Sequence, residues 1–262
     1  MIVGQDKILN KIDKLSLDRF PRSLLLIGPE GSGKHLITDY IMDKLKLPCV
    51  DITETLNLET IEDISLKVEP YIYLIDASKI NVKEENVILK FLEEPLKNSY
   101  IILLCTSKNL LLPTIINRCQ TWELEVYTKE ILEQFISQEC NKEIILKIAN
   151  TPGKVKQLQN YNVDVMIDIA NKIFERISVT NFSNTLTISN KIAFKDEKDK
   201  YNFNLFVDIL LYSIKKKIET EDNPILIKYY KLTDKLCNDR NIPHVSLKSL
   251  FENYLIQLRR IS

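Results

Sequence analysis

Hydrophobic residues in the first half of the chain come in short runs, and the stretches between these runs carry apolar positions at helical spacing. A short apolar run bounded by polar or turn-forming residues is typical of a buried strand. Such runs predict strands at Leu24–Ile27, Cys49–Ile52, Tyr71–Ile75, Tyr100–Cys105 and Thr121–Leu124. Because helices are expected between the strands, the pattern predicts an α/β domain with a parallel sheet covered by helices.

The pattern changes after about residue 125, where we expect no further strand. Two helices are predicted at Lys129–Glu139 and Lys142–Asn150, followed by a stop at Thr151-Pro152-Gly153 and a short helix from Lys154. From about residue 163 onward, one amphipathic helix follows another. We therefore predict three domains: an α/β domain over 1–125, a small helical domain over 126–162 and an all-α domain over 163–262.

Two apolar stripes stand out in the last part of the chain, with hydrophobic residues three and four positions apart. One stripe consists of Phe206, Ile209, Leu210, Ile214 and Ile218, and the other of Leu247, Leu250, Phe251, Tyr254, Leu255, Leu258 and Ile261. Packing in the core of the chain is the preferred interpretation. A subunit interface is the alternative, since a stripe alone does not distinguish the two.

Composition narrows the class of protein. The 262 residues are 45% hydrophobic and 27% charged, with 36 basic and 36 acidic side chains, so net charge alone does not favour a polyanion binder. No apolar run is long enough for a membrane span, and the first residues lack signal-peptide features, so we expect a cytoplasmic protein. Scattered cysteines with no CxxC spacing argue against a zinc site or a disulfide framework: Cys49, Cys105, Cys119, Cys140 and Cys237.

A phosphate-binding loop is predicted directly after the first strand. The segment Gly-Pro-Glu-Gly-Ser-Gly-Lys at 28–34 matches the pattern GxxxxGK, in which backbone N–H groups surround phosphate oxygens and the lysine contacts the β/γ-phosphates. Candidate phosphate-binding residues are Gly28, Gly31, Ser32, Gly33 and Lys34. The next residue is His35, where a working loop has a hydroxyl to hold Mg²⁺, and an imidazole does not replace an oxygen ligand in kind.

Four motifs in order resemble the AAA+ clamp-loader subunits of bacterial DNA polymerase III. Besides the phosphate loop, they are Val3-Gly4-Gln5, the stretch from Asp76-Ala77-Ser78-Lys79 to Leu89-Lys90-Phe91-Leu92-Glu93-Glu94-Pro95, and Asn117-Arg118-Cys119, which resembles the family's Ser-Arg-Cys motif. The resemblance covers roughly residues 1–125. It implies an AAA+ α/β domain, a helical lid and an all-α C-terminal collar domain that serves oligomerisation.

Within that family the chain looks most like delta-prime, the subunit that does not hydrolyse ATP. His35 removes the Mg²⁺ hydroxyl, Ile75 stands at the metal-binding aspartate position with Asp76 at the catalytic glutamate position, and Gly153 replaces the sensor-2 arginine. These changes remove groups that stabilise phosphoryl transfer. The chain departs from delta-prime as well, because the family's four-cysteine zinc module is missing and only Cys49 lies in that interval.

Arg118 is the residue that the resemblance singles out as catalytic, since the family's arginine enters the ATP site of a neighbouring subunit and contacts the γ-phosphate. The structural alternative is an arginine that caps a helix or pairs with a carboxylate. Thr106 stands at the sensor-1 position, where a simple strand-end hydroxyl is an equal interpretation. For Asp76 we favour a cap or hydrogen-bond role at the strand end over a weak base.

Other polar residues receive structural interpretations. Glu93-Glu94-Pro95 is expected to end a helix and shape the turn into the next strand, and Cys119 to pack beside Arg118 without acting as a nucleophile. His244 is expected in a loop or at a helix start. The clusters Lys215-Lys216-Lys217 and Arg259-Arg260 are interpreted as solvated helix faces, with phosphate contact to primed DNA as the alternative.

The resemblance thus predicts a subunit that needs no cofactor and no metal, with ATP or ADP bound without hydrolysis as an open alternative. Its implied partners are gamma/tau-type ATPase subunits, a delta subunit, the sliding clamp and, through the complex, primed DNA. Two other functions stay open. One is an active AAA+ ATPase with an unusual Mg²⁺ shell, and the other is an AAA+ adaptor of a different assembly.

Overall fold

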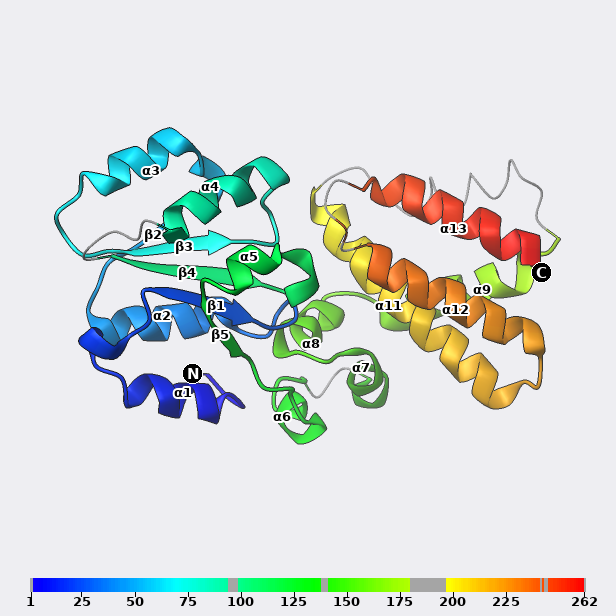
Figure 1. The fold of residues 1–262 in the computed structure, drawn as a ribbon. Helices are drawn as coiled ribbons and strands as arrows, with labels where there is room; N and C mark the ends of the chain where they lie inside the picture. The colour runs from blue at the N-terminus through cyan, green and yellow to red at the C-terminus, as the bar shows by residue number, and fades with distance from the viewer. Residues whose placement is uncertain are drawn as a thin grey trace. The chain divides into compact units, whose positions relative to one another are not determined.

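The structure, a computed structural model, describes residues 2–93, 99–137, 141–179, 197–240, 242 and 245–261. The chain divides into two compact units (Figure 1). The first contains Met1–Phe135 together with Asn150–Lys154, and the second contains Ile136–Ala149 together with Val155–Ser262. The division into domains 1–125, 126–162 and 163–262 stays a prediction.

The first unit is built on a five-stranded parallel sheet with the strand order β2-β3-β4-β1-β5. The strands are β1 Ser23–Ile27, β2 Cys49–Asp51, β3 Ile72–Asp76, β4 Tyr100–Cys105 and β5 Gln120–Glu123. Each lies within one residue of its predicted bounds, so the predicted strands are confirmed. After β5 the described residues contain no further strand, as the sequence predicts.

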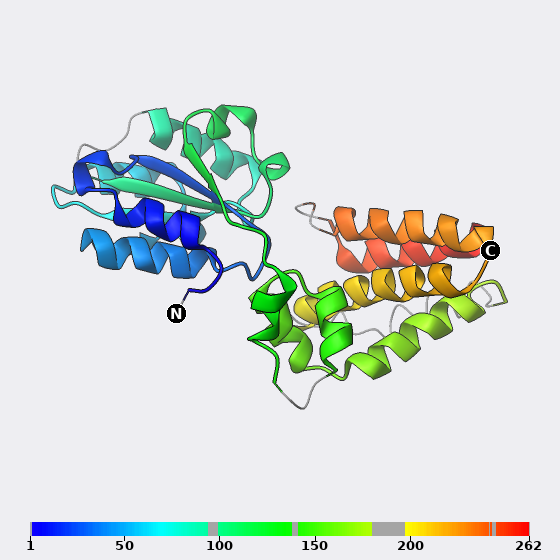
Figure 2. The same cartoon turned by 90° about the horizontal axis from the view of Figure 1, so that it is seen from below.

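Helices cover both faces of the sheet (Figures 1 and 2). On one face lie α1 Asp6–Asp13 and α2 Lys34–Leu45, and on the other lie α3 Leu58–Ser65, α4 Val82–Glu93 and α5 Pro113–Ile116. Alternate strand residues supply the two cores, as strand geometry requires. In β1, for example, Leu24 and Leu26 pack toward α1 and α2, whereas Leu25 and Ile27 pack toward α3, α4 and α5.

Short 3-10 helices complete the connections in this unit: η1 Leu17–Arg19, η2 Thr53–Thr55 and η3 Lys108–Leu110. The helix α6 Lys129–Glu133 is shorter than the predicted Lys129–Glu139, so that predicted extent was wrong. The backbone N–H groups of Gln134 and Phe135 bond to carbonyls three residues back, at 3.2 and 3.1 Å, which tightens the last turn and ends the helix. The last predicted residues of this helix, 138–139, lie outside the described residues.

The second unit is helical throughout its described part. It contains α7 Lys142–Ile148, most of α8 Pro152–Gln159, α9 Val163–Arg176, α11 Glu197–Thr220, α12 Pro224–Asp239 and α13 Leu247–Ile261. Both views show α9, α11, α12 and α13 running alongside one another. The helix predicted from Lys154 begins two residues earlier, at Pro152. Proline is tolerated at a first helical position, and the Thr151 hydroxyl caps the Lys154 N–H at 3.3 Å.

The two apolar stripes lie largely in the core of this unit. Phe206, Ile209, Leu210 and Ile214 of the first stripe are buried, as are Phe251, Tyr254, Leu255 and Leu258 of the second. Phe251 contacts the rings of Phe206 and Tyr254. The core interpretation is therefore confirmed for these residues, and the oligomerisation role of the domain stays a prediction.

Candidate phosphate-loop site

The phosphate loop, residues 28–34, connects β1 to α2 at the carboxyl edge of the sheet. The Gly28 N–H donates to the Cys105 carbonyl at 3.1 Å, which extends the pairing of β1 with β4 by one residue. Gly31 and Gly33 have φ angles of 74° and 90°, a region that side chains other than glycine rarely adopt. Gly33 is the N-cap of α2, so the loop leads directly into the helix start. The elements that position the loop are thus those that the sequence predicts.

Lys34 directs its ammonium group back onto the loop. Its Nζ atom donates to the carbonyl oxygens of Gly28 and Pro29, at 2.6 and 3.0 Å. Burial lowers the pKa of Lys34, because desolvation disfavours the charged form, and the negative charge of Asp76 opposes this shift. The charges of Lys34 and Asp76 therefore lie close enough to interact, while the lysine ammonium is hydrogen-bonded to backbone carbonyls.

Three successive carbonyl groups of the loop accept hydrogen bonds from residues far along the chain. The Glu30 carbonyl accepts from the Thr151 hydroxyl at 2.9 Å, the Gly31 carbonyl from the Gly153 N–H at 3.0 Å, and the Ser32 carbonyl from the Tyr127 hydroxyl at 2.7 Å. These contacts lie within the first unit. Together they hold the outer side of the loop against the start of α8 and against the segment that follows β5. We call this set of three bonds the loop clasp.

The loop clasp includes a very close approach of two glycine backbones. A Cβ atom at Gly153 would lie 2.4 Å from the Gly31 Cα, and one at Gly31 would lie 2.8 Å from the Gly153 Cα. Both distances are shorter than real Cβ contacts, and the neighbours are backbone atoms that do not swing aside. Ser32 is buried beside them, and its Oγ has no hydrogen-bond partner in the described structure. A side chain at 31 or 153 would therefore force the two backbones apart.

The other predicted site residues sit at ends of elements around the loop. Asp76 ends β3, and its carboxylate accepts from the Ser78 N–H and hydroxyl, at 3.1 and 2.5 Å. Ile75 before it is fully buried in the apolar core between the sheet and α3, α4 and α5. His35 is exposed on the first turn of α2, and Thr106 follows β4 and is half-buried.

The N-terminal motif Val3-Gly4-Gln5 is hydrogen-bonded to the segment just after β5. Gln5 is fully buried, and its side-chain amide exchanges two bonds with the backbone of Glu125, at 3.0 and 2.8 Å. Gly4 has a φ of 75°, and a Cβ there would meet Tyr127 and Ile131 at 3.2 and 2.9 Å. The motif therefore supports the same segment that carries Tyr127 to the loop clasp.

Arg118 lies two residues beyond α5, on the surface of the first unit. Its NH1 group donates to the Thr114 carbonyl at 2.9 Å, and its NH2 group donates to the Glu93 carboxylate at 2.6 Å. Both contacts that the structural alternative predicts, a helix carbonyl and a carboxylate, are thus present. The neighbouring Cys119 is half-buried, and burial raises the pKa of its thiol to about 12, so it stays protonated near neutral pH.

The sequence patterns did not predict several of these contacts. Tyr127 carries no local signal, and the partnership of Glu93 with Arg118 joins residues 25 positions apart. Thr151 has a usable signal, because a threonine before a proline is typical of a helix start, although a proline is also a stop signal for the helix before it. Residues 94–95, with His244 and Cys140, lie outside the described residues.

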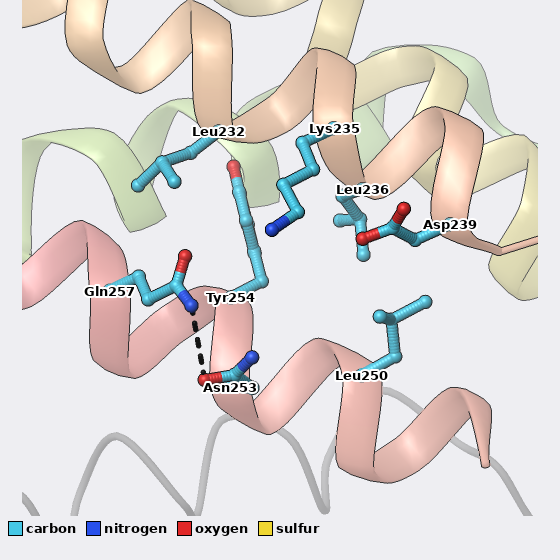
Figure 3. Close-up of a pocket in the computed structure, with 8 residues that line it drawn as sticks. All are labelled: Leu232, Lys235, Leu236, Asp239, Leu250, Asn253, Tyr254 and Gln257. Atoms are coloured by element: carbon cyan, nitrogen blue, oxygen red, sulfur yellow. Dashed lines mark hydrogen bonds between the residues drawn. The ribbon is translucent and has the colours of Figure 1, made fainter. Parts of the chain in front are cut away.

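One hollow in the described part of the chain is too small for a small-molecule site. A hollow between α12 and α13 is lined by Lys235, Asp239, Asn253 and Gln257 among others, and Figure 3 shows the bond between the last two, at 3.3 Å. Its volume of about 30 Å³ is on the scale of a bound water.

Among the described residues, no three His, Cys, Asp or Glu side chains are grouped so as to hold a metal ion. The described helices also include none with the length and apolar character of a membrane span.

Part of this chain is similar in sequence to known proteins. Residues 52–128 match the family model described as DNA polymerase III, delta subunit. DNA polymerase III subunit delta-prime of Haemophilus influenzae is 35% identical over 86 residues, which are 32% of this chain and 26% of that protein. The similar segment therefore spans about a quarter of that relative's length.

Two comparisons extend over nearly the whole chain. DNA polymerase III subunit gamma of Buchnera aphidicola is 25% identical over an alignment that covers all of this chain and 83% of that protein. The crystal structure of a DNA polymerase III gamma subunit-related protein from Thermotoga maritima superposes with a TM-score of 0.50 over 98% of this chain and 99% of that one, at 17% identity. That structural likeness shows the fold alone, an α/β domain with a parallel sheet followed by helices. The chain is thus similar to a delta-prime subunit of DNA polymerase III over about a third of its length, and to a gamma subunit over all of it.

Proposed function

We propose that this chain is a non-hydrolysing, delta-prime-like subunit of a DNA polymerase III clamp loader, which supplies Arg118 to the ATP site of a neighbouring ATPase subunit. The observation that carries the first half of this proposal is Ile75. This side chain is fully buried in apolar surroundings at the end of β3, where an ATPase of this family needs a carboxylate to hold Mg²⁺. No rearrangement of an isoleucine supplies an oxygen ligand.

The remaining groups around the loop support the same conclusion. His35 is exposed and offers no hydroxyl, and Asp76 uses its carboxylate to receive two bonds from Ser78. Gly153, at the sensor-2 position, contacts the loop by its backbone instead of offering a cation to a γ-phosphate. A phosphoryl-transfer site without a metal ligand, a metal hydroxyl and this cation lacks the groups that stabilise the transition state.

The second half of the proposal concerns Arg118 and the partners. Its side chain is 37% exposed on the surface of the first unit, so the guanidinium is accessible to another molecule. A guanidinium contacts phosphate oxygens through paired N–H groups and stabilises the charge of a transferring phosphoryl group. We infer gamma/tau-type ATPase subunits and a delta subunit as partners, with the sliding clamp and primed DNA engaged through the complex. No cofactor is required in this role, and ATP or ADP bound without hydrolysis is compatible with it.

Reconstitution with the gamma-type ATPase and delta subunits of the same organism tests the proposal. The chain alone is expected to show no ATP turnover above that of a Lys34→Ala variant. Turnover by the isolated chain that Lys34→Ala abolishes would instead establish the active ATPase. In the assembly, Arg118→Ala is expected to reduce ATP hydrolysis and clamp loading by at least tenfold.

A matched control separates this effect from the general loss of a surface cation. Arg19, an exposed arginine at the end of η1 in the same unit, is replaced by alanine in parallel. Arg19→Ala is expected to leave turnover unchanged. If Arg118→Ala has the same turnover as Arg19→Ala and wild type, Arg118 does not act in trans.

A further inference from the structure

We propose that Glu93 is a positioning residue for Arg118, which holds the guanidinium in place before a neighbouring subunit binds. This inference rests on the proposed role of Arg118 in trans. Glu93 is the last residue of α4 and Arg118 follows α5, and their side chains meet at 2.6 Å between Oε1 and NH2. Glu93 thus contacts the Arg118 guanidinium, whose orientation decides whether it reaches a phosphate of the neighbouring subunit's ATP.

The backbones behind the two side chains are fixed by shared core packing. Ile88, Phe91 and Leu92 of α4 and Ile115 of α5 are buried in the same apolar cluster, between these helices and the sheet. The Thr114 carbonyl, which accepts from NH1 at 2.9 Å, belongs to α5 as well. The guanidinium is therefore held at two points by elements that do not move independently of each other.

The geometry leaves the guanidinium able to act. An arginine side chain has five N–H donors in a planar fork, and the bonds to Glu93 and Thr114 use two of them. The remaining donors are sufficient for phosphate oxygens on another edge of the fork. Because the side chain is already ordered, its engagement requires less loss of rotamer freedom than that of an unrestrained arginine.

Stability does not account for this pair. The side chains of Arg118 and Glu93 are 37% and 53% exposed, and ion pairs of that exposure contribute little to folding. A purely structural role therefore predicts that removal of the Glu93 carboxylate changes nothing that is measured in the assembly. A positioning role predicts a loss of turnover with little change in folding or in affinity for ATP.

The test measures ATP hydrolysis against ATP concentration in the reconstituted assembly for wild type, Glu93→Ala, Glu93→Gln, Arg118→Ala and the double variant Glu93→Ala/Arg118→Ala. We expect Glu93→Ala to lower kcat by about three- to tenfold with KM for ATP within about twofold. Glu93→Gln keeps an acceptor oxygen and is expected to lie between it and wild type. The double variant is expected to match Arg118→Ala alone, because Glu93 acts only through Arg118.

Glu123→Ala provides the matched control. Glu123 is an exposed carboxylate of the same unit that forms a surface ion pair with Lys108, so its removal makes the same change of charge. This variant is expected to retain wild-type turnover. In the isolated chain, ¹⁵N relaxation of the Arg118 Nε–H group is expected to show a more mobile side chain in Glu93→Ala than in wild type.

The outcomes distinguish the two proposals. If Arg118→Ala lowers turnover while Glu93→Ala leaves it unchanged or raises it, the positioning role is wrong and the trans role of Arg118 stands. Equal mobility of the Arg118 side chain in wild type and Glu93→Ala would also overturn the positioning role. Unchanged turnover in Arg118→Ala would overturn the trans role itself, and with it the purpose assigned to Glu93.

Discussion

Replacement of Gly153 by alanine tests the loop clasp directly, because the new Cβ atom would lie 2.4 Å from the Gly31 Cα and 3.0 Å from the Gly31 carbonyl oxygen. Neither of these backbone atoms moves without shifting the phosphate loop. Overpacking of this kind costs about 1–3 kcal/mol. The better helix propensity of alanine returns less than about 1 kcal/mol. With the middle of the overpacking range, about 2 kcal/mol, we therefore expect a net loss of about 1–2 kcal/mol of unfolding free energy in the first unit.

Trp122 provides a local probe for this measurement. It is the single tryptophan of the chain and is 3% exposed in the core of the first unit, so its fluorescence reports the unfolding of that unit. A local probe is needed because a chain with two compact units does not have to unfold in one step. With a urea m-value of about 2 kcal/mol/M, Gly153→Ala is expected to lower the midpoint by about 0.5–1 M.

Two further glycine variants separate steric overlap from backbone strain. At Gly33, whose φ is 90°, a Cβ would meet only ordinary contacts of 3.7 Å or more, so Gly33→Ala carries the left-handed strain alone. At Gly31, both the φ of 74° and the 2.8 Å overlap apply, so Gly31→Ala is expected to be the least stable of the three. If Gly153→Ala unfolds at the wild-type midpoint, the loop and α8 do not constrain each other, and the reasoning is refuted.

Two more predictions concern residues beside the site. Tyr127→Phe removes the hydroxyl that donates to the Ser32 carbonyl at 2.7 Å, so we expect a loss of about 1–2 kcal/mol in the same urea titration, and an unchanged midpoint would show that water replaces this bond. Burial raises the pKa of Cys119 to about 12, so at pH 8 its thiolate fraction is on the order of 10⁻⁴. Alkylation by iodoacetamide, followed by mass spectrometry, is expected to be at least about a hundredfold slower in the folded chain than in urea. Similar rates in the two states would contradict the buried, protonated thiol.

Local patterns were sufficient for the sheet and for the place of the loop. A strand in a parallel sheet is buried on both faces, so it leaves a continuous apolar run such as Tyr100–Cys105, whose bounds the structure reproduces. The glycines and lysine of 28–34 are consecutive, and the strand before them and the helix after them are both visible in the sequence. Local patterns did not determine every helix end. Lys129–Glu139 was predicted too long, because the 3-10 turn after Glu133 has no apolar signature.

The sequence by itself determined which residue types stand at the site, including Ile75 and His35, whose side chains offer no oxygen ligand to Mg²⁺. Only the tertiary structure decided what these groups contact. Thr151, at the start of α8, reaches Glu30 across 121 positions. Tyr127 reaches Ser32 across 95, because the parallel strands β1 and β5 that precede these two residues end at the same edge of the sheet. The pairing of Glu93 with Arg118 likewise depends on how α4 and α5 pack over the sheet. The spacing of apolar residues indicates, for each helix or strand separately, which face is buried. It does not indicate which side chains of distant elements come into contact.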